Sequence, residues 1–196
     1  MRSLFGLVLF LMAGAAMAVP APKHVSWPPR APCTGCVLIQ YDHIEMQIPA
    51  GLARRILVPD IGTPALTLLP APDSAAGGIH LLHEDPAPVL AVLERDGLHR
   101  RHGIGNLPDL LRLLAHPPPD DRLARAFALL GFDDAATVTV ARRGKLTAWR
   151  IVHPDPLNNV LYIAADGHAR LYKIAGRLTD ATWQSLLAHM AFSPPP

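Results

Sequence analysis

The two cysteines of the chain, Cys33 and Cys36, stand in a C-x-x-C spacing. Thiols at this spacing can form a disulfide, exchange electrons with another thiol or bind a metal. In redox proteins the motif opens a helix after a strand, where the helix dipole lowers the pKa of the first thiol. Here prolines precede the motif, and the residues after it follow the pattern of a strand. The context favours a structural disulfide between Cys33 and Cys36, with thiol–disulfide catalysis by the same pair as the alternative.

The ten histidines are a second set of residues that could do chemistry, as metal ligands. His99 and His102 are three residues apart, a spacing that brings two side chains together on a helix. They flank Arg100-Arg101, whose charge disfavours a bound cation, and no glutamate or cysteine completes a zinc set. His80 and His83 share the spacing on an expected strand, which puts them on opposite faces. Metal binding through His99 and His102 is therefore a further alternative, and we expect no cofactor.

Sequence signatures of other enzyme classes do not occur. No serine stands in G-x-S-x-G, and neither H-E-x-x-H nor a phosphate-binding P-loop is found. The acidic pairs lie where helices begin or loops turn, and helix capping explains such positions. The arginine pairs Arg54-Arg55, Arg100-Arg101 and Arg142-Arg143 would form a surface for an acidic partner only if the fold brought them together. The sequence favours binding over catalysis.

The amino terminus indicates an exported protein. Arg2, a short apolar run and Ala16-Met17-Ala18 have the layout of a secretory signal peptide over residues 1–18. This run is too short to span a bilayer, and charged residues or prolines interrupt the later apolar runs, so we expect no transmembrane span. A formal net charge of +2 argues against a nucleic-acid binder, which carries a concentrated basic footprint. We expect a periplasmic or secreted protein whose partner is another exported protein.

Prolines divide the chain into an arm, a domain and a tail. They make residues 19–36 a stiff arm outside the core, and they predict a disordered tail over residues 193–196. Residues 37–192 are long enough for one globular domain with its own hydrophobic core.

Periodicity within residues 37–192 predicts the α+β class. The expected strands cover 37–48, 65–69, 79–83, 137–141, 146–152, 160–165 and 168–175, and the expected helices between them cover 88–96, 107–115 and 120–130. Asp166-Gly167 predicts a tight hairpin. Thr179 predicts the cap of a last helix, which buries Trp183, Leu186, Leu187 and Met190 against the sheet. The sequence thus predicts a single domain, with a largely antiparallel sheet and helices grouped on one face.

The segment from Val160 to Met190 resembles the closing part of thioredoxin-like proteins, because a strand, Asp166-Gly167, a second strand and a capped helix follow in that order. This resemblance implies thiol–disulfide chemistry at Cys33 and Cys36. The rest of the chain departs from that family, since no W-C-x-x-C follows a strand. We therefore expect an exported binding or inhibitor-like accessory protein without an evident catalytic site, with the thioredoxin-like and metal-binding functions as alternatives.

Overall fold

The structure is a computed structural model that describes residues 19–30, 32–59, 65–72, 77–116, 118 and 120–193. The expected signal peptide over 1–18, and residues 194–196 of the expected tail, lie outside the described residues. The described residues form five α-helices and eleven strands, arranged in a large, mostly antiparallel sheet and a small second sheet. The α+β class predicted from the sequence is confirmed.

The main sheet is the centre of the fold. Eight of the described strands form it, in the order β1 (Lys23–His24), β7 (Thr137–Arg143), β8 (Leu146–Val152), β9 (Val160–Ala165), β10 (Tyr172–Gly176), β6 (Ile79–His83), β5 (Ala65–Leu69) and β4 (Arg55–Leu57). Neighbouring strands are antiparallel except for β1 and β7. All six residues of β9 are buried, which requires that both faces of the sheet are covered.

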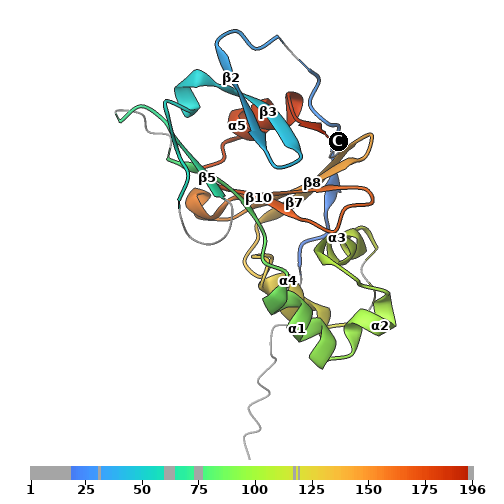
Figure 1. The fold of residues 1–196 in the computed structure, drawn as a ribbon. Helices are drawn as coiled ribbons and strands as arrows, with labels where there is room; N and C mark the ends of the chain where they lie inside the picture. The colour runs from blue at the N-terminus through green and yellow to red at the C-terminus, as the bar shows by residue number, and fades with distance from the viewer. Residues whose placement is uncertain are drawn as a thin grey trace, which may run out of the picture.

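Four helices cover one face of the main sheet (Figure 1). They are α1 (Ala87–Arg95), α2 (Leu98–His102), α3 (Leu107–Arg112), which the 3-10 turn η2 (Leu113–Ala115) extends, and α4 (Leu123–Ala128). Leu110 of α3, Phe132 and Tyr162 of β9 are fully buried in the core that this layer shares with the sheet. Asn106 caps α3, since its side chain accepts a hydrogen bond from the backbone N–H of Asp109.

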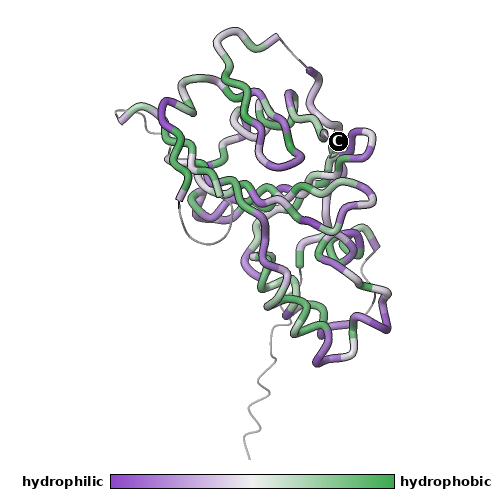
Figure 2. The backbone as a smooth tube through the Cα atoms, in the orientation of Figure 1, coloured by the Kyte–Doolittle hydropathy of each residue, from purple (hydrophilic) through white to green (hydrophobic). Residues whose placement is uncertain are grey.

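A three-stranded sheet and a single helix cover the opposite face (Figure 1). The sheet has the order β11 (Ala191–Phe192), β3 (Ile44–Pro49) and β2 (Cys36–Tyr41), and the helix is α5 (Asp180–Ala188). The predicted last helix is confirmed, because Thr179 caps it and Trp183, Leu186 and Leu187 are buried in a second core. Figure 2 shows hydrophobic positions along the strands of both sheets, where the layers meet. The short 3-10 turns η1 (Ala50–Leu52) and η3 (Pro156–Asn158) complete the described elements.

The strand expected over residues 37–48 is wrong, because the chain reverses inside it. β2 and β3 pair as an antiparallel hairpin, and Asp42 in the turn has a φ of 53°. Aspartate adopts this left-handed conformation more readily than most residues. The hairpin predicted at Asp166-Gly167 is present, since β9 and β10 pair antiparallel and the N–H of His168 donates to the carbonyl of Ala165 at 3.1 Å across the turn. The second strand is shorter than predicted, because β10 begins only at Tyr172.

The amino-terminal arm belongs to the folded structure, contrary to the prediction that it stays outside the core. β1 pairs with β7, and the backbone N–H of Val25 donates to the carbonyl of Val140 at 2.9 Å. The indole N–H of Trp27 donates to the carbonyl of Leu187 at 2.8 Å. The prolines leave residues 23–27 free, so this stretch keeps the backbone donors that pairing needs.

Candidate functional site

Cys33 and Cys36 lie within disulfide distance, with their Cα atoms 5.6 Å apart. Cys36 is the first residue of β2, so a strand follows the motif and no helix dipole acts on either sulfur. This arrangement has the form of a structural disulfide that joins the arm to β2. It lacks the feature that activates a thiol in redox proteins. In the segment that resembles thioredoxin-like proteins, β9 and β10 pair antiparallel and α5 follows them.

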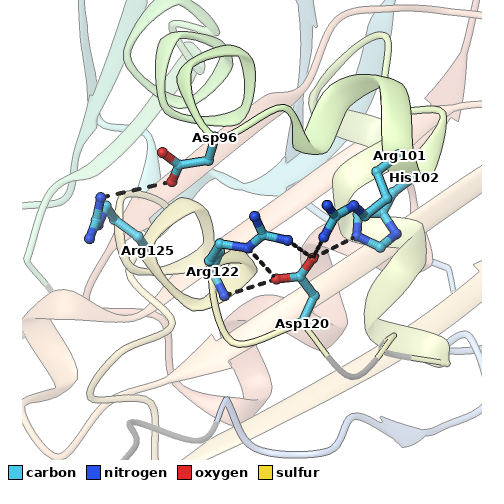
Figure 3. Close-up of polar contacts among 6 residues, drawn as sticks. All are labelled: Asp96, Arg101, His102, Asp120, Arg122 and Arg125. Atoms are coloured by element: carbon cyan, nitrogen blue, oxygen red, sulfur yellow. Dashed lines mark hydrogen bonds and ion pairs between the residues drawn. The ribbon is translucent and has the colours of Figure 1, made fainter.

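The histidine pair proposed as metal ligands lies in α2, where His102 contacts a carboxylate. His102 Nε2 is 3.2 Å from Oδ2 of Asp120, and Arg101 and Arg122 contact the same carboxylate (Figure 3). A metal ion beside His102 would face two guanidinium groups. The Nδ1 atom of His99 is buried without a hydrogen-bond partner among the described residues. No group of three or more histidine, cysteine, aspartate or glutamate residues in the described part of the chain is arranged to hold a metal.

A second polar cluster, here called the Asp42 cluster, surrounds the turn between β2 and β3. Arg170 and Tyr172 each donate to Oδ2 of Asp42 at 2.8 Å, and His83 Nε2 lies 3.5 Å from the same oxygen. Burial alone would raise the pKa of Asp42, but these hydrogen bonds and the charge of Arg170 lower it overall. Desolvation lowers the pKa of His83, and Asp42 opposes part of that effect.

The Asp42 cluster links segments that are far apart in the sequence. The core beside Tyr41 and Tyr172 is closely packed, since the cavity there has a volume of only about 10 Å³, roughly enough for one water. Tyr172 and Arg170 follow β9, whereas Asp42 joins β2 to β3. The cluster therefore fixes the β2–β3 hairpin on the main sheet.

A third site, which we call the basic pocket, lies where the arm, the β7–β8 hairpin and the last strand meet. Its volume is about 630 Å³. The basic residues that line it are Arg30, Arg143, Lys145 and His168, and the apolar ones are Leu146, Met190, Ala191 and Phe192. Among the described residues that line the pocket, none is acidic. In the described part of the chain, Arg30, Arg143 and Lys145 also have no carboxylate within ion-pair distance.

Arg143 is the fixed cation of the basic pocket. Its Nη1 donates to the carbonyl of Ala188 at 3.2 Å and its Nη2 to that of Met190, while its Cζ lies 4.9 Å from the ring centre of Trp27. The last carbonyls of a helix have no donor within the helix. Arg143 and Trp27 supply donors for the end of α5, and the same contacts hold the guanidinium at the pocket.

The charges of the basic pocket are not balanced within the described chain. Desolvation lowers the pKa of Arg143, and the like charge of the nearby Arg30 lowers it further. An anion between them would reduce this repulsion. Arg142, the preceding residue in β7, points to the other side of the strand and pairs with Asp166 at 2.6 Å.

The sequence did not predict the basic pocket, because its cations come from distant segments of the chain. The one signal was the Arg142-Arg143 pair, since adjacent strand residues point to opposite faces and one of the two must face the β2–β3 layer. The three arginine pairs do not converge. Arg101 binds Asp120 in the helical layer, Arg55 begins β4, and neither lines the pocket.

No protein-family model matches this chain, and no curated protein is significantly similar to it. Among the described residues, no helix combines the length and the apolar character needed to cross a membrane. The geometry of the basic pocket is therefore the basis for a functional assignment.

Proposed function

We propose that this chain is an exported binding protein, of an accessory or inhibitor-like kind, that holds an anionic ligand in the basic pocket. One observation carries the proposal. Arg30, Arg143 and Lys145 converge on a pocket of about 630 Å³ without an acidic residue among its described lining. A volume of this order is typical of small-molecule sites, which run from roughly 300 to 1,000 Å³.

The composition of the pocket supports binding better than catalysis. Its described lining contains no cysteine, serine, aspartate or glutamate that could act as a nucleophile or a carboxylate base. The guanidinium of Arg143 is held by backbone carbonyls, and a fixed cation binds an anion with little loss of side-chain freedom. Arg30 and Lys145 are exposed and add attraction from the rim.

Export is part of the same proposal. It rests on the signal layout of residues 1–18 and on the cysteine pair at disulfide distance. Disulfides persist in oxidising compartments and are rare in the cytosol.

Calorimetric titration of the chain from Val19 onward, here called the mature chain, with citrate, a compact tricarboxylate, tests the proposal. The double variant Arg30→Gln/Lys145→Gln should bind citrate at least about tenfold more weakly, because it removes two of the three unpaired cations. The double variant Arg54→Gln/Arg55→Gln loses the same charge away from the pocket and should bind like the parent. Equal affinities of the two double variants would contradict an anion site in the basic pocket.

A further inference from the structure

The strand that borders the basic pocket has a free edge. β11 stands at the end of the three-stranded sheet and pairs only with β3. The N–H of Ser193 donates to the carbonyl of His43 at 2.8 Å. Residues of an antiparallel pair alternate between those that exchange hydrogen bonds with the partner and those that do not. Ala191 and Ser193 therefore turn their backbone groups to β3, and the N–H and C=O of Phe192 point away from it.

This free backbone edge lies next to the cations. Met190 has the same parity as Phe192 along the strand, and its carbonyl accepts a hydrogen bond from Nη2 of Arg143. Met190 and Phe192 both line the pocket with Arg143 and Lys145. Figure 1 shows the last red segment of the chain beside the orange β7–β8 hairpin and the blue arm. Backbone donors and acceptors thus stand beside fixed positive charge.

An aromatic surface formed by Phe192 and two histidines lies beside the cations and the free backbone edge. The ring of Phe192 lies 4.5 Å from the ring of His168 and 5.8 Å from that of His43, centre to centre. Phe192 is half-buried, so part of this surface is open to a ligand. An apolar side chain can pack there while a neighbouring carboxylate reaches the cations.

We propose that the anionic ligand is an extended peptide segment, whose carboxylate binds Arg30, Arg143 and Lys145 while its backbone pairs with Phe192 along the free edge of β11. This inference rests on the proposed function and names the class of its ligand. A peptide that adds to a sheet edge gains main-chain hydrogen bonds and a pocket for a side chain. A simple inorganic anion would use the cations alone and would leave the outward N–H and C=O of Phe192 to water.

Because β11 is short, we expect the complex to depend more on charge than on backbone hydrogen bonds. The strand has two residues, so the ligand gains few backbone hydrogen bonds and the cations supply much of the attraction. Binding should weaken as salt is added, because salt screens exposed charges. The carboxylate is either the end of the peptide chain or an acidic side chain, and two peptide probes distinguish these sources.

NMR titration of the mature chain with short peptides at millimolar concentration tests the inference. The first probe is acetyl-Ala-Ala-Val with a free carboxylate, which should shift the backbone amide of Phe192 and the indole N–H of Trp27. Amidation of its end should weaken binding at least about tenfold. A second probe, acetyl-Ala-Asp-Val amide, carries the charge on a side chain. Shifts with this probe and not with the first would assign the carboxylate to an acidic residue.

Two controls separate the backbone from the charge. Acetate carries the same charged group without a peptide backbone and should leave the Phe192 amide unshifted. The peptide methylated at each internal amide nitrogen should bind several-fold more weakly than its parent. If citrate binds in the pocket while both carboxylate peptides bind no tighter than acetate, the peptide inference is overturned and the anion site stands. If citrate also fails to bind, the proposed function falls with it.

Discussion

The layers on the two faces of the main sheet differ in the partners of their charged side chains. In the helical layer each exposed cation of the polar network meets a carboxylate: Arg101 and Arg122 contact Asp120, and Arg125 contacts Asp96 (Figure 3). On the opposite face, Arg143 donates to backbone carbonyls, and neither it nor Lys145 has a carboxylate partner in the described chain. Each of these three arginines therefore has a carboxylate partner, whereas the cations of the basic pocket have none in the described part of the chain and are left for a ligand.

The two layers do not differ in the quality of their cores. Leu186 and Leu187 of α5 are fully buried on one face, as are Leu110 and Leu111 of α3 on the other. Both layers are thus expected to be stable parts of one domain. The difference between them lies in the polar groups at the rim of each layer.

The largest expected effect is on stability, from Trp183→Ala in α5. Trp183 is 7% exposed, packs in the core beneath the small sheet and lies 5.0 Å from the guanidinium of Arg150. Truncation should lower the free energy of unfolding by roughly 3–5 kcal/mol, measured by urea denaturation. Phe132→Ala on the helical face is the matched change and should cost a similar amount. Unchanged unfolding of Trp183→Ala together with lost citrate binding would make α5 a recognition surface instead of a core helix.

A smaller loss is expected from Asp120→Asn in the helical layer. The carboxylate contacts Arg101, His102 and Arg122, and the substitution removes its charge from the centre of these contacts. Because the arginines are largely exposed, we expect a loss of about 1–2 kcal/mol in unfolding free energy. Citrate affinity should stay the same. A change in citrate affinity without a change in stability would place an anion site in the helical layer.

The pH dependence of stability should report on the Asp42 cluster. The pKa of His83 is lowered from its ordinary value near 6.5, chiefly by desolvation, so the unfolded chain takes up this proton first as pH falls. Stability should therefore be unaffected by this residue above about pH 6.5 and should decrease below it. The lowered pKa of Asp42 adds a second loss at more acidic pH, where that carboxylate is protonated.

Unfolding of His83→Gln at pH 7.5 and at pH 5 measures the histidine part of this effect. The variant should lose less stability than the parent between the two values. His80→Gln is the control, because His80 is exposed and its ring bonds Thr67 on the other side of β6. Identical pH profiles of the parent and His83→Gln would show that His83 does not contribute.

The smallest effect is expected from replacing Cys33 and Cys36 by serine. Cys33 and Cys36 are only three positions apart in the sequence. A disulfide that closes so short a loop restricts the unfolded chain least. The unfolding midpoint should move only slightly. Thiol-exchange kinetics test the redox alternative. An acidic pKa for the Cys33 thiol, or insulin reduction by the purified protein, would favour thiol–disulfide catalysis over a structural disulfide.

Local chemistry in the sequence predicted much of the fold. Thr179 caps the helix it was expected to cap, and apolar residues alternate with polar ones along β7, where Val138 and Val140 are buried. Residues whose conformation depends on distant partners were missed. The turn at Asp42 has no glycine to mark it, and its conformation is supported by Arg170 and Tyr172 from the other end of the chain.

The basic pocket escaped prediction for the same reason. Arg30, Arg143 and Lys145 are ordinary exposed residues in the sequence, and they come together only because β1 pairs with β7 and Trp27 packs beneath Arg143. The helix α2 was missed because its sequence LHRRH has a single apolar residue and shows no stripe. Local sequence patterns cannot predict the pairing of the arm with β7, because these two segments are far apart in the sequence.

Chemical-shift mapping of the mature chain with citrate tests the central claim most directly, because it locates the anion on one face or the other. The account predicts that the largest shifts fall on the indole N–H of Trp27 and on the backbone amides of residues 143–145 and 168, which border the basic pocket. Residues 101, 102 and 120–122 should stay unshifted, because their charges are already paired. Shifts concentrated at those helical residues, or no shift at Trp27 with citrate in millimolar excess, would contradict it.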